Sequence, residues 1–209
     1  MNWIPGDITL NGQTVDLIPM SREHFPELIK LAEDKRIWEF YSIDLANAER
    51  FLKWLELGLE EKLKGMSYPF VIYHKANNKI IGGTRFLDIV PIHKKLEIGS
   101  TWLIPEYWAK EINPECKLLL LTFCFETLKT VRVQLKTDEN NIRSQKAIVK
   151  IGGQFEGILR HDAIKDNGTN RNSAYFSIID TEWEEKKAKL VDLIENKRKE
   201  TYLARQHNS

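Results

Sequence analysis

Apolar and polar residues follow two different periods along this chain, and the periods mark its helices and strands. From Ala48 to Leu63 apolar residues recur at helical spacing, which predicts an amphipathic surface helix capped by Asp44 or Asn47. From Val131 to Thr137 apolar and polar residues alternate strictly, which predicts a strand. The chain therefore contains both kinds of element, and their order decides the fold class.

About seven strands are predicted, and they are expected at 15–19, 69–74, 79–90, 94–103, 131–137, 154–160 and 173–179. The second, third and fourth are joined by short turns, which is typical of an antiparallel meander. Gly82 and Gly83 mark a bulge or a close backbone approach. Because helices separate most of the others, we expect an α/β (α+β) fold, with a mixed, mostly antiparallel sheet and helices on both faces.

The other helices are predicted after Ser21, after Pro114, from Asn140 to Ile151 and from Thr181 to Lys199. Pro114 suits a helix start because its missing N–H is not needed there. We expect no capping box at Ser21, since His24 stands where Glu or Gln is required. The aromatic stretch 38–41 is compatible with either core or the wall of a cleft.

Composition narrows the function classes. The 209 residues suit a single domain, expected over 1–183, with a helix and frayed tail over 184–209. Lys plus Arg is 31 against 30 for Asp plus Glu, so no basic surface recommends nucleic acid as a partner. Neither a signal peptide nor a membrane-spanning apolar run is evident, which predicts a cytoplasmic protein that does not insert into a membrane.

The cysteines and histidines do not indicate a catalytic site, a metal site or a disulfide. Cys116 and Cys124 have no CxxC spacing, so we expect core thiols and neither a metal site nor a disulfide. His161 and Asp162 are neighbours, and adjacent residues of a strand point to opposite faces. We therefore expect them in a loop after the sixth strand, as substrate contacts at most.

The stretch around residues 102–121 predicts an anion site. Trp102, Leu103 and Ile104 end a strand, and a tight connection from Glu106 to Asn113 leads to the helix at Pro114. The free N–H groups and the dipole of a helix start favour a negatively charged ligand.

Three stretches of the sequence resemble the GNAT acetyltransferases, in particular their RimJ/RimL-like branch. They are VDLIPMS, LEIGSTWLIPEYWAKEIN and TDENNIRSQKAIVKIGGQFEGILR, and the resemblance covers about residues 15 to 183. It implies a sheet that splays between its fourth and fifth strands, with acetyl-CoA as cosubstrate in the splay. The pantetheine arm would pair with the fourth strand, and the pyrophosphate would lie on the loop before the helix.

The resemblance also implies roles for individual residues. Glu97 would be the base that accepts the amine proton, and Ser144 would protonate the departing thiolate. Asn140 would bond the cofactor, and backbone N–H groups near Leu103 would polarise the thioester. The plain alternatives are a solvated Glu97, an Asn140 that only caps its helix, and a surface Ser144.

The phosphate loop departs from the glycine-rich pattern of the family. The residues expected to bind the cofactor are Trp102, Leu103, Ile104, Trp108, Ala109, Lys110, Glu111, Ile112, Asn113, Asn140 and Ser144. Trp108, Glu111 and Asn113 stand where Arg or Gln, Gly, and Gly or Ala are usual. A carboxylate at Glu111 would face the pyrophosphate, with Lys110 as the one compensating charge.

Two functions follow from these observations. The first is an acetyl-CoA-dependent N-acetyltransferase acting on a primary amine, either a protein N-terminus or a small molecule, by direct attack on the thioester. The second is a non-catalytic GNAT-like binding domain, which Glu111 and the missing glycines favour. Both are compatible with a homodimer, and neither involves nucleic acid.

Overall fold

The computed structural model describes residues 3–206, and its strands form a single sheet of eight in the order β1-β2-β3-β4-β5-β6-β8-β7. The strands are β1 (Leu10–Asn11), β2 (Val15–Pro19), β3 (Tyr68–His74), β4 (Lys79–Val90), β5 (Lys95–Leu103), β6 (Arg132–Asp138), β7 (Gln154–Ile164) and β8 (Asn170–Ile179). β5 and β6 pair in parallel, and the other neighbours pair antiparallel. The mixed, mostly antiparallel sheet is confirmed, with the short β1 as an unforeseen edge strand.

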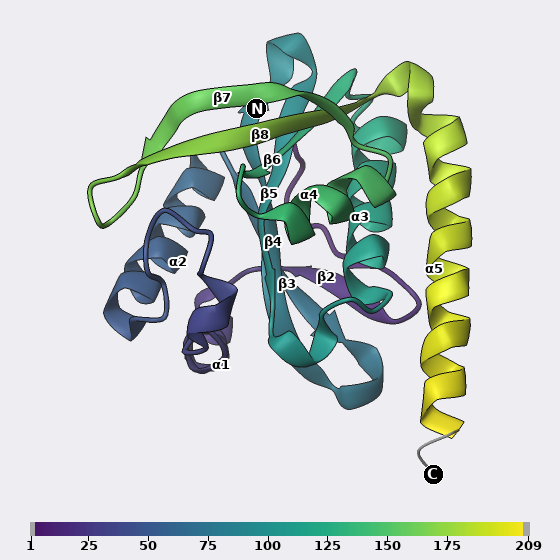
Figure 1. Cartoon of the computed structure of the whole chain (residues 1–209), viewed down its shortest axis with the longest axis horizontal. Coiled ribbons are helices and arrows are strands. Elements are labelled where there is room, and N and C mark those ends of the chain that lie inside the picture. The colour runs from purple at the N-terminus through teal and green to yellow at the C-terminus, as the bar shows by residue number, and fades with distance from the viewer. Residues whose placement is uncertain (1–2, 207–209) are drawn as a thin grey trace.

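Helices cover both faces of this sheet. They are α1 (Phe25–Leu31), α2 (Ala48–Leu63), α3 (Ile112–Thr122), α4 (Ile142–Lys150) and α5 (Trp183–Gln206). Figure 1 shows α1 and α2 on one side of the sheet, and α3 and the long α5 on the other. α2 begins where the Asn47 side chain accepts a hydrogen bond from the Arg50 N–H at 3.0 Å, and it buries Phe51 and Leu55 toward the sheet. None of the helices in the described range is long and apolar enough to cross a membrane.

The two glycines of β4 have the role that the sequence indicated. A Cβ on Gly82 would lie 2.1 Å from the carbonyl oxygen of Trp102, so β4 and β5 approach too closely there for any side chain. The pairing between these strands shifts register between Gly83 and Arg85, opposite Trp102 and Gly99. The extra residue lies in β5, where Ser100 takes a left-handed φ of 46°. This bulge bends β5 where the sheet begins to open.

β5 and β6 diverge, which confirms the expected splay. They pair only from Lys95 to Glu97 of β5 and from Arg132 to Gln134 of β6. Beyond that point β5 runs on to Leu103 and pairs only with β4, while β6 runs on to Asp138 and pairs only with β8. One edge of β5 therefore lies along the opening.

Several predicted helix boundaries were wrong, most by one or two residues and the end of α5 by seven. α3 begins at Ile112, two residues before Pro114, and Glu111 is its N-cap residue. The proline therefore lies within the first turn of the helix and does not open it. α4 begins at Ile142, with Asn141 as its cap, because the Asn141 side chain accepts the Ser144 N–H at 3.0 Å. α5 runs to Gln206 instead of ending at Lys199, and 207–209 lie outside the described residues.

Two other local predictions were also wrong. The Ser21 N–H donates to Nδ1 of His24 at 3.0 Å, so a histidine closes the capping box that we assigned only to Glu or Gln. His161 and Asp162 lie within β7, which extends to Ile164, and not in a loop. β7 continues past Arg160 because it pairs with β8 again at Ala163 after a bulge.

Candidate active site

A cleft of about 510 Å³ occupies the opening between β5 and β6. Seven of the residues expected to be functional line it, namely Glu97, Trp102, Leu103, Trp108, Ala109, Asn113 and Ser144. Five expected residues, Ile104, Lys110, Glu111, Ile112 and Asn140, are not among its lining. The cleft is also lined by residues that the sequence did not single out, including Asp88, Lys117, Lys136, Asn141, Arg143 and Arg171.

Glu97 lies where the paired part of β5 ends and the cleft begins. Its side chain is buried, Gln134 Nε2 donates to its Oε2 at 2.8 Å, and Lys136 Nζ lies 3.6 Å from the same oxygen. Burial raises the pKa of Glu97 above its ordinary value, and Lys136 and the Gln134 hydrogen bond oppose that rise. A carboxylate in this setting suits a proton acceptor that works near neutral pH.

Lys136 connects Glu97 to the next strands of the sheet. Its Nζ lies 4.0 Å from Oδ2 of Asp162, and the Tyr175 hydroxyl donates to Oδ1 of Asp162 at 2.9 Å. Asp162 therefore helps to fix a charged group beside Glu97, a place that its position in the sequence did not reveal. A register that pairs Lys136 with Tyr175 brings these groups together.

Ser144 approaches the cleft from α4, and the asparagine before it differs from the one expected. Asn141 caps α4 and lines the cleft, while Asn140 is exposed and bonds to Oδ1 of Asp138 through its backbone N–H at 2.9 Å. The cue in the sequence is spacing, because a cap side chain bonds the N–H three residues later, and Ser144 is three residues after Asn141. Asn140 therefore shapes the turn and Asn141 faces the ligand space.

The loop between β5 and α3 has an unusual backbone without glycine. After one turn of 3-10 helix, Pro105–Tyr107, the residue Ala109 takes a left-handed φ of 61°. Trp108 Nε1 donates to the carbonyl of Leu103 at 2.7 Å, which ties the loop back to the end of β5. Ala109 thus supplies a conformation that a glycine adopts at less cost.

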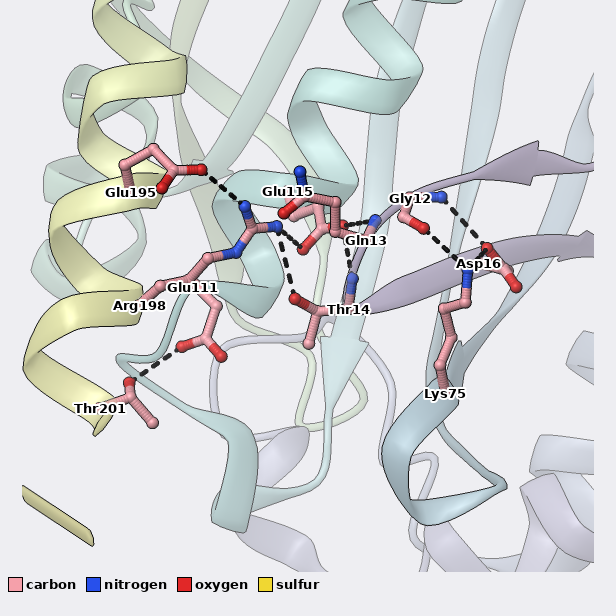
Figure 2. A network of polar contacts seen from close by, with 10 residues as sticks. All are labelled: Gly12, Gln13, Thr14, Asp16, Lys75, Glu111, Glu115, Glu195, Arg198 and Thr201. Carbon is pink, nitrogen blue, oxygen red and sulfur yellow. Dashed lines mark hydrogen bonds and ion pairs between the residues drawn. The ribbon is translucent and has the colours of Figure 1, made fainter. Parts of the chain in front are cut away.

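Glu111 does not face the cleft, which corrects the expectation of a carboxylate against the pyrophosphate. Its side chain is buried, and the Thr201 hydroxyl of α5 donates to its Oε2 at 3.1 Å. Figure 2 shows Glu111 directed toward α5. The residue has an ordinary helical φ of −65°, so a glycine is not needed at this position. Tertiary contact with α5, 90 residues away in the sequence, decides this orientation.

Lys117 is a buried cation in the cleft that sequence reasoning missed. It is 5% exposed, and its Nζ donates to Oγ1 of Thr101 at 2.6 Å. Among residues 3–206 it forms no ion pair with a carboxylate. Burial lowers the pKa of Lys117 to about 8. The sequence did not indicate this burial, because a lysine on a helix is usually exposed to solvent, even beside an apolar run such as LLLL.

A second positive charge lies at the loop itself. The guanidinium of Arg143 lies over the Trp108 ring, with Cζ 4.1 Å from the ring centroid, and both residues line the cleft. Stacking on an aromatic ring holds an arginine in place while its N–H groups stay available to an anion. The residue offers the phosphate loop a charge that Lys110, outside the lining, does not.

The aromatic stretch 38–41 contributes both to the core and to the wall of the cleft, the two roles that the sequence left open. Trp38 is core: it is buried, its Nε1 donates to the carbonyl of Ala32 at 2.7 Å, and its ring lies 5.4 Å from that of Trp102. Phe40 and Tyr41 line the cleft.

The tip of the β7–β8 hairpin contacts the segment between α1 and α2. At its tip, the Asp166 N–H donates to the carbonyl of Ser42 at 2.8 Å, and Asp166 Oδ2 accepts the Asp44 N–H at 2.8 Å. Figure 1 shows the hairpin reaching from the sheet toward α2. These hydrogen bonds therefore fasten together two segments that are far apart in the sequence.

The two cysteines are buried core thiols, as expected. Burial raises the pKa of Cys116 to about 12 and that of Cys124 well above its ordinary value, so neither is a reactive thiolate.

The comparisons with known proteins all indicate the same family. A family model described as "Acetyltransferase (GNAT) domain" matches residues 15–154. YdaF of Bacillus subtilis, provisionally named a ribosomal N-acetyltransferase, is 32% identical over 96 residues, which are 46% of this chain and about half, 51%, of YdaF.

Solved structures extend the likeness to nearly the whole chain. A GCN5-related N-acetyltransferase from Brucella melitensis is 25% identical, with a TM-score of 0.83, and the match covers 91% of this chain and 86% of that protein. The ribosomal L7/L12 α-N-protein acetyltransferase RimL, solved with coenzyme A, shares the fold at 20% identity, a TM-score of 0.70 and coverage of 82% and 98%.

Proposed function

Because this chain belongs to the GNAT acetyltransferases, in their RimJ/RimL-like branch, we propose that it transfers the acetyl group of acetyl-CoA to a primary amine. The observation that carries this proposal is the placing of Glu97 and Ser144 in one cleft, from β5 and α4. A base and a proton donor are the two groups that acyl transfer to an amine needs.

The cleft offers binding groups for both ends of acetyl-CoA, the pantetheine arm and the pyrophosphate. Beyond Glu97, the edge of β5 toward the opening is not paired with β6, so its N–H and C=O groups can bond an extended amide-containing arm. At the loop, the start of α3 and the Arg143 guanidinium offer donors and positive charge to a pyrophosphate. Lys117 adds a buried donor to the lining of the cleft.

Each catalytic group of the chain has one task in the reaction. Glu97 accepts a proton from the incoming ammonium group, directly or through water, and frees the lone pair that attacks the thioester carbonyl. Backbone N–H groups of β5 near Leu103 stabilise the negative charge that develops on the carbonyl oxygen. Ser144 donates a proton to the thiolate that leaves and regains one from the nitrogen, which loses its second proton as the amide forms. The products are an amide, a thiol and the proton held by Glu97.

We infer a protein N-terminus as the acceptor, on the name of the RimL neighbour. The non-catalytic alternative rested on Glu111 and on the missing glycines. The Glu111 carboxylate bonds to Thr201 instead of facing the cleft, and Ala109 takes the left-handed φ that a glycine would provide. A homodimer, a cytoplasmic location and the domain limits 1–183 and 184–209 stay predictions from the sequence.

A thermal-shift titration followed by a turnover assay tests the proposal. Millimolar acetyl-CoA should raise the melting temperature, because a ligand that binds only the native state stabilises it by mass action. Thiol release in the presence of peptides with free and with blocked N-termini then separates the acceptors. No shift in melting temperature at millimolar acetyl-CoA would overturn the function, and acetylation of small amines but not of peptides would overturn the acceptor.

A further inference from the structure

α5 lies outside the segment that matches the family, yet it contacts the phosphate loop at successive points. Lys197 Nζ donates to the carbonyl of Ala109 at 2.7 Å, and the Thr201 hydroxyl donates to Oε2 of Glu111 at 3.1 Å. Lys197 and Thr201 are four residues apart, so both project from one face of the helix. That face therefore contacts the loop on both sides of Lys110.

A third contact joins the same face of α5 to the first turns of α3. Arg198 Nη2 donates to Oε2 of Glu115 at 2.8 Å, and Glu115 is buried. The other oxygen of Glu115 accepts the N–H groups of Gln13 at 2.5 Å and Thr14 at 2.9 Å (Figure 2). Glu115 thus fastens the β1–β2 turn, α3 and α5 at one point.

The loop needs such support because of its own residues. Ala109 has a left-handed φ, which a residue with a Cβ keeps only where the surrounding structure holds it. The acceptor that Lys197 reaches is the carbonyl of that same residue. In addition, two carboxylates, Glu111 and Glu115, stand near a helix start that is to receive an anion.

We propose that α5 positions the phosphate-binding loop, with Lys197, Arg198 and Thr201 replacing the support that glycines give elsewhere in the family. Thr201 and Arg198 turn the two carboxylates away from the ligand space, and Lys197 fixes the carbonyl of Ala109. These three are positioning residues, since none of them lines the cleft. The inference rests on the proposed function for the identity of the ligand. The effect of α5 on the loop does not depend on that function and can be measured in the free protein.

The test is the double variant Lys197→Met with Thr201→Val, which removes both contacts to the loop and leaves the buried Glu115 paired with Arg198. Lys187→Met is the matched control, because Lys187 is on α5 too and pairs with Glu126 at 2.6 Å, away from the loop. Thr201→Ser keeps the hydroxyl and serves as rescue in the Lys197→Met background. Arg198 is left in place because its loss would break the ion pair of the buried Glu115, whereas Thr201→Val removes only a neutral hydroxyl donor from Glu111.

Two measurements are made on each variant. Hydrogen exchange of the peptide covering 106–113 in the free protein should become faster in the double variant and stay unchanged in the control. Calorimetric titration with acetyl-CoA should show an affinity about three- to tenfold weaker in the double variant, as expected for the loss of one exposed and one partly buried hydrogen bond. The kcat at saturating acetyl-CoA should stay within about twofold of wild type. The rescue variant restores only the contact to Glu111, so its affinity should lie between those of the wild type and the double variant.

Unchanged exchange in the loop would overturn the inference, as would unchanged affinity in a double variant whose loop exchanges faster. Equal effects of Lys187→Met and of the double variant would overturn it too, because α5 would then act only through general stability. Failure of the wild type to bind acetyl-CoA is a different result, since it refutes the proposed function while the exchange data still decide the role of α5.

Discussion

Gln134 donates a hydrogen bond of 2.8 Å to Glu97, and the two residues face each other at the last paired position before the sheet opens. Their pairing holds a buried carboxylate at the inner end of the cleft. The same carboxylate has a raised pKa, chiefly through burial, so its ionisation should govern the acid side of the reaction.

Gln134→Leu should move the acid limb of the kcat/KM profile to higher pH. The hydrogen bond from Gln134 favours the charged carboxylate, and its loss raises the pKa of Glu97 further, so the base becomes active only at a higher pH. The measurement is the pH–rate profile at constant ionic strength. An acid limb at the wild-type pH would show that Glu97 does not set it.

Glu97→Gln should depress the rate most below the pKa of the acceptor amine, where the amine still carries its proton. Above that pKa the amine is neutral without help, and the rates of the variant and the wild type should converge. Profiles that stay parallel over the whole pH range would mean that Glu97 positions substrate and does not accept its proton.

Ser144→Ala should lower kcat by roughly a hundredfold, the contribution typical of a general acid, and leave the affinity for acetyl-CoA nearly unchanged. Asn141→Ala, by contrast, removes the cap bond to the Ser144 N–H and should cost about 1 kcal/mol of stability. Single-turnover kinetics separate chemistry from product release. An unchanged rate of the chemical step would exclude Ser144 as the proton donor.

Lys117→Met should gain stability over the wild type at neutral pH and lose that advantage as the pH rises. The native state holds Lys117 with a pKa of about 8, while the unfolded chain has the ordinary value of 10.5. Between these values the unfolded state binds more protons, so the stability of the wild type rises with pH. The gap between the two proteins should shrink by at most roughly 3 kcal/mol from pH 8 to pH 10.5.

Urea denaturation at several pH values measures this gap. Lys199→Met, at an exposed position of α5, is the control for a change in net charge. A gap between Lys117→Met and wild type that does not vary with pH would mean that Lys117 keeps its proton in the native state throughout.

Glu111→Gly should weaken acetyl-CoA binding several-fold, and equally at low and high salt. The carboxylate is bonded to Thr201 and does not meet the phosphates, so its removal loosens the loop without relieving any repulsion. Tighter binding by Glu111→Gly at low salt, seen by calorimetry, would show that the carboxylate faces the ligand.

The sequence by itself determined those features that depend on a few neighbouring residues. Alternation predicted β6, helical spacing predicted α2, and the pair Gly82 and Gly83 marked the tight approach of β4 to β5. The resemblance added the splay and brought Glu97 and Ser144 to one cleft. It misplaced the asparagine by one residue, because Asn140 and Asn141 are adjacent and only hydrogen-bond geometry separates a turn residue from a cap.

Only the tertiary structure decided what Glu111 and Lys117 do. Glu111 follows a helix-start pattern that predicts an anion site, but its partner Thr201 is 90 residues away in the sequence. Lys117 precedes a run of leucines on α3, and the group that accepts its hydrogen bond is the hydroxyl of Thr101 on β5. The physical reason is the same for both: the direction and charge state of a side chain follow from the groups packed against it, and those groups come from elements that the local pattern does not bring together.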